Sequence, residues 1–213
     1  MDLRLASFLE RAFLFRVEGV KNVLTLWRIA MIPWYAFAAY WAISWLRVKR
    51  TKTAESLSSR LATILPMVLA FELLFSKSLR VGPLGLRFLP ADDWIVWSGI
   101  AVTSVGVAVA IWARYSIGQY WSARVTLKEG HRVIRSGPYA FVRHPIYTGM
   151  LVAAVGTALV IGEWRGVLAV AVMWAAHTHK ALREEKLLTT ELGEEYASYR
   201  RSTGFLFPRL WRG

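Results

Sequence analysis

The sequence predicts an all-α integral membrane protein with about five transmembrane helices. Long apolar stretches, few charged residues and many aromatic side chains all favour this fold. Of the 213 residues, 55% are hydrophobic, 14% are aromatic and only 19% are charged, whereas a soluble domain carries about 25% charged residues. An all-helical soluble bundle is the alternative, and the hydropathy strongly disfavours it.

Five apolar stretches are predicted to be the membrane helices, since a bilayer core about 30 Å thick requires about 20 apolar residues. They cover residues 29–46, 61–75, 94–113, 146–161 and 167–176. Only a short polar turn separates the last two, which predicts a tight antiparallel helical hairpin. Residues 3–20 are expected to form an N-terminal interfacial helix on the membrane surface. After the hairpin we expect a C-terminal amphipathic helix, interrupted at Gly193.

The distribution of positive charge predicts the orientation. The formal net charge is +13, and 18 of the 27 Lys and Arg residues fall in 47–60, 114–145 and 177–213. With five spans these three segments lie on one side, so the positive-inside rule places the C-terminal half in the cytoplasm. The apolar stretches favour membrane lipids, and not nucleic acid, as the partner of this basic chain. The oligomeric state is left open.

Several chemistries are excluded or disfavoured. The chain has no Cys, so disulfides and thiol catalysis are excluded. His177 and His179 point to different helix faces, so no metal site is expected. Glu72 lies inside a predicted span, where an unpaired charge is costly, and we expect Arg28 to pair with it.

We divide the chain into residues 1–113, an interfacial helix with three spans, and residues 114–213, a candidate catalytic half. Segment 114–145 is longer and more polar than an ordinary hairpin loop, and such loops are often functional. It leads into the stretch Arg143-His144-Pro145-Ile146-Tyr147-Thr148-Gly149. Pro145 is favourable at the first turn of a helix. A second group of polar residues, Lys180 to Glu185, follows the last span.

Together these stretches resemble the isoprenylcysteine carboxyl methyltransferase family of integral membrane enzymes. The resemblance extends from about Gly118 to Arg209. Its blocks are Gly118-Gln119-Tyr120-Trp121-Ser122, the run from His131 to Tyr139, the run from Arg143 to Gly149, Glu184-Glu185, and Gly193-Glu194-Glu195-Tyr196-Ala197-Ser198-Tyr199. Their order and spacing are typical of a broad superfamily, in which phospholipid N-methyltransferases and some membrane reductases have similar C-terminal halves.

The resemblance implies methyl transfer from S-adenosyl-L-methionine to the carboxylate of a prenylcysteine-like lipophilic acceptor. It implies an enclosed cytoplasmic cofactor pocket in the C-terminal half. By position, the cofactor-binding residues are His131, Arg132, Val133, Ile134, Tyr139, His144, Pro145, Ile146, Tyr147 and Glu184. The candidate catalytic residues are Arg143 and Lys180, which would orient the acceptor's anion. Binding of anionic lipid headgroups is the alternative role for Arg143. The family usually has arginine where this chain has Lys180, and lysine keeps the charge but loses bidentate carboxylate recognition.

The residue types suit this chemistry. Glu184 can accept hydrogen bonds from the cofactor, and the rings of Tyr139 and Tyr147 can attract its sulfonium by cation–π interaction. A carboxylate acceptor is already ionised near neutral pH and needs no general base. An amine acceptor needs one. Glu185 is the candidate for that base, although we expect its side chain to face solvent.

Three alternatives remain open from the sequence. Phospholipid N-methylation would use the same cofactor. A reductase would use a nicotinamide cofactor in the same pocket, although the chain has no G-x-G-x-x-G fingerprint. A membrane scaffold or transporter subunit is supported only by Glu72.

Overall fold

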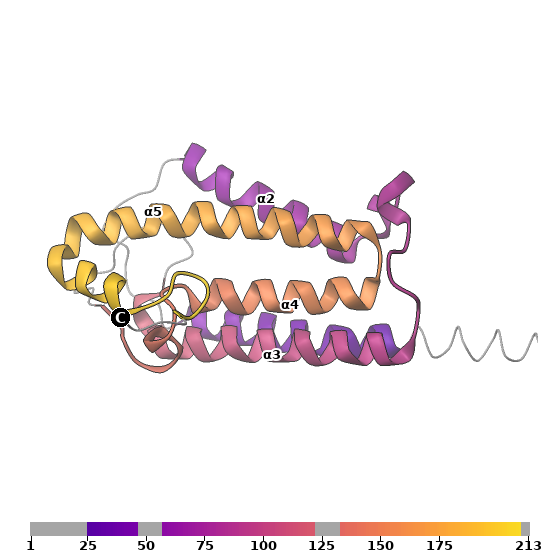
Figure 1. Cartoon of the computed structure of the whole chain (residues 1–213), viewed down its shortest axis with the longest axis horizontal. Helices are drawn as coiled ribbons and strands as arrows, with labels where there is room; N and C mark the ends of the chain where they lie inside the picture. Colours follow the sequence, from indigo (N-terminus) through magenta and orange to yellow (C-terminus); the bar gives the residue numbers. More distant parts are fainter. Residues whose placement is uncertain (1–24, 47–56, 122–132, 210–213) are drawn as a thin grey trace, which may run out of the picture.

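The computed structural model describes residues 25–46, 57–121 and 133–209. These residues form a first helix over 25–45, then α2 (Leu57–Phe75), α3 (Asp93–Ile117), α4 (Pro145–Ile161) and α5 (Trp164–Ser202) (Figure 1). The short 3₁₀ helices are η1 (Lys77–Leu79), η2 (Gly82–Gly85), η3 (Gly118–Tyr120) and η4 (Gly137–Ala140). In this described part β pairing is limited to isolated bridges, so the all-α prediction is confirmed. The predicted interfacial helix, 3–20, lies outside the described residues.

The helices form a bundle in which α3 packs along α4, and α5 packs on both α4 and α2 (Figure 1). The predicted hairpin is confirmed: α4 ends at Ile161 and α5 begins at Trp164. Gly162 allows the tight turn because its φ is 63°, in the left-handed region. The predicted boundary at residue 113 falls near the end of α3, and the division into two halves stays a prediction.

Small residues bring α3 and α4 into backbone contact. A Cβ atom on Gly106 would lie 2.3 Å from the backbone nitrogen of Ala153, and one on Gly156 would lie 2.3 Å from that of Thr103. Glycines at such positions let two helices approach closely, as is common between membrane helices. The first helix joins this contact, since the Trp34 indole donates a hydrogen bond of 3.0 Å to the buried Thr157 hydroxyl.

The outer face of α3 carries the features of a lipid-facing helix. Trp94, Trp97, Trp112 and Tyr115 are all exposed, with Val105 exposed between the two pairs. The pairs are centred 18 residues apart along the chain, about 27 Å in an α-helix. That spacing is close to the thickness of a bilayer core, and aromatic residues concentrate at both interfaces.

Two helices in the described part, α2 and Asp93–Tyr120, are long and apolar enough to cross a membrane by length and composition. Helix α4 is apolar but shorter, with 17 residues. The count of five spans therefore stays a prediction.

The expected pairing of Arg28 with Glu72 is wrong. Both side chains are exposed, and no ion pair joins them among the described side chains. The aromatic rings of α2 explain the difference: Phe71 and Phe75 pack against Trp34 with centroid distances of 5.5 and 5.6 Å. These rings occupy the face of α2 toward the first helix, so the intervening Glu72 turns away from it.

The described parts of the three basic segments lie at one end of the bundle, on the left in Figure 1. The Arg114 guanidinium donates a 2.9 Å hydrogen bond to the carbonyl of Ser44, near the end of the first helix. Arg183 of α5 likewise contacts Ser59, near the start of α2. At the same end α5 bends at Gly193, whose φ of 51° interrupts the helix as predicted. The loops at this end form the candidate active site.

Candidate active site

Residues 133–144, the segment before α4, form one wall of the site and are held by residues 203–209, the C-terminal segment. The backbone N–H of Arg143 donates to the carbonyl of Gly204 at 2.9 Å, and Gly204 donates back to the carbonyl of Phe141 at 3.1 Å. The buried Tyr199 hydroxyl donates to the Tyr139 carbonyl at 2.7 Å. These bonds fix the path of the backbone at Arg143, just before α4 begins.

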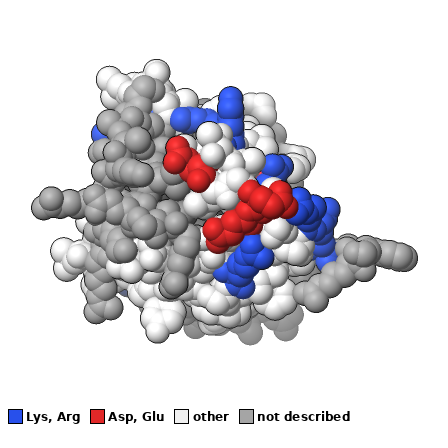
Figure 2. All heavy atoms as spheres, turned by 90° about the vertical axis from the view of Figure 1, so that its left-hand side faces the viewer, with Lys and Arg blue, Asp and Glu red and all other residues white. Residues whose placement is uncertain are grey.

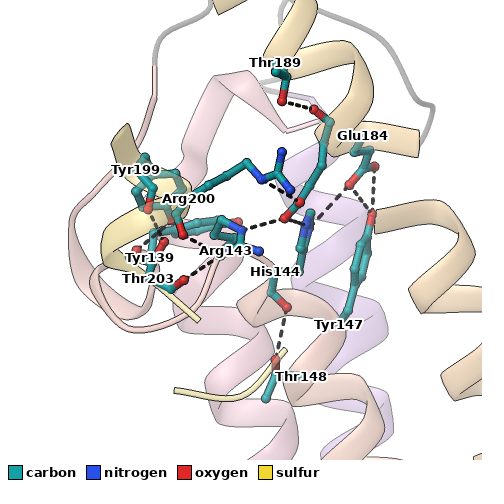
Figure 3. A network of polar contacts seen from close by, with 11 residues as sticks. Tyr139, Arg143, His144, Tyr147, Thr148, Glu184, Thr189, Tyr199, Arg200 and Thr203 are labelled. Atoms are coloured by element: carbon teal, nitrogen blue, oxygen red, sulfur yellow. Dashed lines mark hydrogen bonds and ion pairs between the residues drawn. The ribbon is translucent and has the colours of Figure 1, made fainter. Parts of the chain in front are cut away.

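The two acidic residues of α5 have different environments (Figure 3). The Tyr147 hydroxyl lies 2.8 Å from both carboxylate oxygens of Glu184. His144 Nδ1 and Lys180 Nζ lie 3.7 and 3.8 Å from the same carboxylate. The Glu184 side chain keeps an exposed fraction of 20%. Glu184 is therefore oriented by protein groups and still accessible to a ligand.

Glu185, the next residue, is held from several sides. Its carboxylate lies 2.6 Å from Arg143 Nε, 3.3 Å from His144 Nε2 and 3.2 Å from Arg200 Nε. The expectation that Glu185 faces solvent is wrong, because the residue is only 4% exposed. Burial raises the pKa of this carboxyl, but hydrogen bonds from His144 and Arg143 outweigh burial, and the net pKa is lowered. Glu185 is thus an ionised anchor for the surrounding cations.

Tyr147 is fixed by stacking as well as by hydrogen bonding. Its ring stacks on His177 with centroids 4.6 Å apart and on His144 with centroids 5.5 Å apart. The ammonium of Lys180 lies 5.5 Å from the centre of the same ring. His177 and Lys180, both buried, therefore surround the tyrosine that orients Glu184.

A cavity joins most of the predicted site residues. Those that line it are Val133, Ile134, Tyr139, Arg143, His144, Ile146, Tyr147 and Glu184. Pro145 and Lys180 do not line it: Pro145 is fully buried in α4, and Lys180 is buried beside Tyr147 and Glu184. His131 and Arg132 lie outside the described residues.

Half of the residues that line the cavity were not predicted from the sequence. The additional residues are Ile117, Tyr120, Trp121, Leu187, Leu188, Leu192, Tyr196 and Tyr199. A sequence signal for two of them existed: Leu188 and Leu192 follow Glu184 at intervals of four residues, so the three share one helix face. The kink at Gly193 then brings the two tyrosines over the cavity.

Buried tyrosines give the cavity neutral phenols. Burial raises the pKa of Tyr139, Tyr196 and Tyr199 above the ordinary value, so all three stay protonated at neutral pH. The Tyr196 hydroxyl is buried without a hydrogen-bond partner among the described residues. Buried polar groups are rarely left unpaired, and this one lies on a cavity wall. In the described part, no three His, Asp or Glu side chains come together as a metal site.

The fold and the site together define a class: a helical membrane protein with an aromatic-rich cavity at one end of its bundle. The sequence model of the isoprenylcysteine carboxyl methyltransferase family matches residues 99–190. The resemblance predicted from the motifs is therefore confirmed.

The chain is also similar to individual proteins. The protein-S-isoprenylcysteine O-methyltransferase of Schizosaccharomyces pombe is 31% identical over 101 residues, which cover 46% of this chain and 43% of the relative. The uncharacterised protein YpbQ of Bacillus subtilis is 30% identical over 38% of this chain and 48% of its own length. The chain thus spans less than half the length of each of these two relatives.

A solved structure agrees with the fold. The eukaryotic intramembrane Ras methyltransferase ICMT superimposes with a TM-score of 0.53, over 74% of this chain and 54% of that one. The sequences are 22% identical in this match, so the likeness concerns the fold alone.

Proposed function

We propose that this protein is an integral membrane methyltransferase that uses S-adenosyl-L-methionine and methylates the carboxylate of a prenylcysteine-like lipophilic acceptor. One observation carries the proposal: the family's sequence blocks, far apart in the chain, meet around one cavity with the carboxylate of Glu184 in its wall. The match to the family between residues 99 and 190 supports the reaction type.

The cavity's chemistry fits the cofactor, which supplies an electrophilic methyl group on a sulfonium. Glu184, partly exposed and oriented by Tyr147, is suited to bind the ammonium or hydroxyl groups of such a ligand. The ring of Tyr139, which lines the cavity, offers a face for a cation, whereas His177 and His144 already stack on the Tyr147 ring. Apolar side chains from both walls, among them Ile134 and Leu188, exclude water from the ligand. The unpartnered Tyr196 hydroxyl is a further donor at this wall.

Lys180 is the candidate for attracting the acceptor. Its ammonium lies 3.8 Å from Glu184 and 5.5 Å from the Tyr147 ring centre, next to the cavity wall. A carboxylate drawn to this ammonium would lie close to Glu184 and so to the cofactor site. Alignment of the two reactants and exclusion of water then supply most of the rate enhancement.

Arg143 has a different role from Lys180. Its guanidinium binds Glu185 through Nε and donates through Nη1 to the carbonyls of Thr203 and Arg200 at 2.5 and 3.2 Å. Because these protein groups occupy it, we assign Arg143 to positioning: it holds the segment before α4 against the C-terminal segment. This replaces the role of anion ligand expected from the sequence.

The same network disfavours amine methylation. A general base must accept a proton, but Glu185 has a lowered pKa and several cationic partners. We therefore favour an acceptor that is already ionised. We place the cavity on the cytoplasmic side, because the basic loops share its end of the bundle.

The test is transfer of a labelled methyl group from S-adenosyl-L-methionine by the purified full chain in detergent. We expect base-labile label on a small prenylated cysteine and none on phosphatidylethanolamine. Glu184→Gln should lose at least about 90% of this activity, because the substitution removes the cavity's oriented charge. Glu72→Gln is the matched control, since Glu72 is exposed and away from the cavity. Base-stable label on the amine lipid, or equal activity of the two variants, would contradict the proposal.

A further inference from the structure

A second hollow lies on the outer side of the C-terminal segment, separate from the cavity except at Arg143. It is a groove lined by Arg143, Ala197, Arg200, Arg201, Thr203, Gly204, Phe205, Phe207 and Arg209. Among the described residues no acidic side chain lines it. The groove therefore presents four guanidinium groups together with two aromatic rings.

The charges around the groove do not cancel. Figure 2 shows this end of the bundle, where basic groups flank a cluster of acidic groups. Glu185 serves both Arg143 and Arg200. Glu194 pairs with Arg201. Two carboxylates thus face four guanidinium groups, and the groove keeps a positive surplus that attracts an anion.

The C-terminal segment sets the level of the groove in the bundle. The Thr148 hydroxyl donates a 2.6 Å hydrogen bond to the carbonyl of Leu206. Leu206 is 3% exposed and belongs to the apolar core with Leu151. The groove therefore lies beside the first turns of α4, where the predicted membrane span begins.

The side chain next to that anchor points outward. Phe207 is 66% exposed, although its neighbour Leu206 is buried. An exposed aromatic ring beside arginines is the pattern of a segment that contacts the membrane interface, with the ring among acyl chains and the cations among headgroups. A soluble anion would have no use for the ring.

From this geometry we infer that the groove binds the phosphate-bearing headgroup of an anionic phospholipid in the adjoining leaflet. The exposed guanidinium groups of Arg201 and Arg209 contact the phosphate, and Phe207 inserts beside the acyl chains. Because Arg143 lines both the groove and the cavity, a bound headgroup also steadies the network that holds Glu185. The inference depends on the membrane position of the chain and not on methyl transfer.

The test measures binding of phosphatidylglycerol and phosphatidylcholine to the purified full chain in neutral detergent. Arg201→Gln/Arg209→Gln removes two exposed charges of the groove and spares the arginines that bind Glu185. Arg60→Gln/Lys186→Gln, the matched control, removes two exposed charges from the same end outside the groove. Each arginine near anionic lipid is expected to contribute about fivefold in affinity, so the groove variant should bind phosphatidylglycerol about 25-fold more weakly. The control should stay within about twofold of the parent protein.

Competition separates the lipid from other anions. Inorganic phosphate and a polyglutamate peptide, each at millimolar concentration, should leave phosphatidylglycerol bound. Displacement by phosphate would overturn the assignment in favour of a free anion, and displacement by the peptide would overturn it in favour of an acidic polypeptide. Equal losses in the two double variants, or no loss in the groove variant, would also refute the inference.

Discussion

Tyr147 makes the hydrogen bonds that orient Glu184, and Tyr147→Phe removes only the hydroxyl responsible. The ring remains in place because His177 and His144 stack on it. Without the hydroxyl, the contacts left to Glu184 from the described residues are the longer ones to His144 and Lys180, at 3.7 and 3.8 Å. The substitution therefore separates orientation of the carboxylate from packing of the site.

The size of the expected effect follows from the charge of Glu184, which accepts the hydrogen bond. A hydrogen bond to a charged group contributes about 1.5–3 kcal/mol, and about 1.4 kcal/mol corresponds to a tenfold change in affinity. We expect the dissociation constant for S-adenosylhomocysteine, measured by calorimetry, to rise at least about tenfold. Thermal stability should fall only slightly, because Glu184 is 20% exposed and water can replace the lost donor.

Tyr115→Phe is the control for removal of a tyrosine hydroxyl. Tyr115 is 75% exposed on the outer face of α3, so its variant should bind the ligand like the parent protein. If Tyr147→Phe changed the dissociation constant by less than about twofold, the role of Tyr147 in orienting Glu184 would be refuted. The same conclusion would follow if both variants lost affinity equally.

Three further predictions address the other parts of the structure. Glu185→Gln should destabilise the protein by about 3 kcal/mol, because it removes the carboxylate from the nearly buried Arg143 guanidinium. Since the folded-state pKa of Glu185 is lowered, its stabilisation is present above the unfolded pKa of about 4.3 and is lost as the pH falls toward the folded-state pKa, so the stabilities at pH 7 and pH 4 should differ less in the variant than in the parent. Lys180→Ala should raise the KM for the methyl acceptor at least about fivefold, while the dissociation constant of S-adenosylhomocysteine changes less than about twofold. Lys180→Arg should retain acceptor binding. An unchanged KM in the alanine variant would argue against a role of Lys180 in attracting the acceptor. Gly106→Leu should prevent stable packing of α3 on α4, because even a Cβ atom there would lie 2.3 Å from the backbone of α4. Ala101→Leu, on the exposed face of α3, should melt like the parent protein. Equal melting temperatures of the two variants would refute close packing of α3 on α4.

Much of the site was predictable because the short turn of a helical hairpin determines which residues of its two helices lie side by side. The turn at residues 162–163 places positions at equal distances from it side by side. Tyr147 and His177 lie 15 and 14 residues from that turn, and their rings stack. The hairpin therefore places the first turn of α4 opposite His177 and Lys180, and Glu184 lies one helical turn beyond Lys180.

The roles of the two acidic residues could not be predicted in the same way. Neighbouring residues on a helix differ by about 100° in direction, so one points to the cavity and the other to the arginines. Which is which depends on the segment before α4 and on Arg200. Arg200 reaches Glu185 only because α5 bends at Gly193. The Arg28–Glu72 prediction failed for a related reason. The two residues lie at a similar depth in the predicted membrane, but the packing of Phe71 and Phe75 against Trp34 determines which face of α2 meets the first helix.

We predict that residues 133–147 and the part of α5 from Glu184 to Tyr199 form one binding site for an S-adenosyl cofactor. Calorimetry of the full chain with S-adenosylhomocysteine and with NADPH tests it most directly. Micromolar binding of the first, lost in Glu184→Gln and retained in Glu72→Gln, with no heat from NADPH, is the predicted result. Binding of NADPH in place of S-adenosylhomocysteine, or S-adenosylhomocysteine affinity that is insensitive to Glu184→Gln, would contradict it.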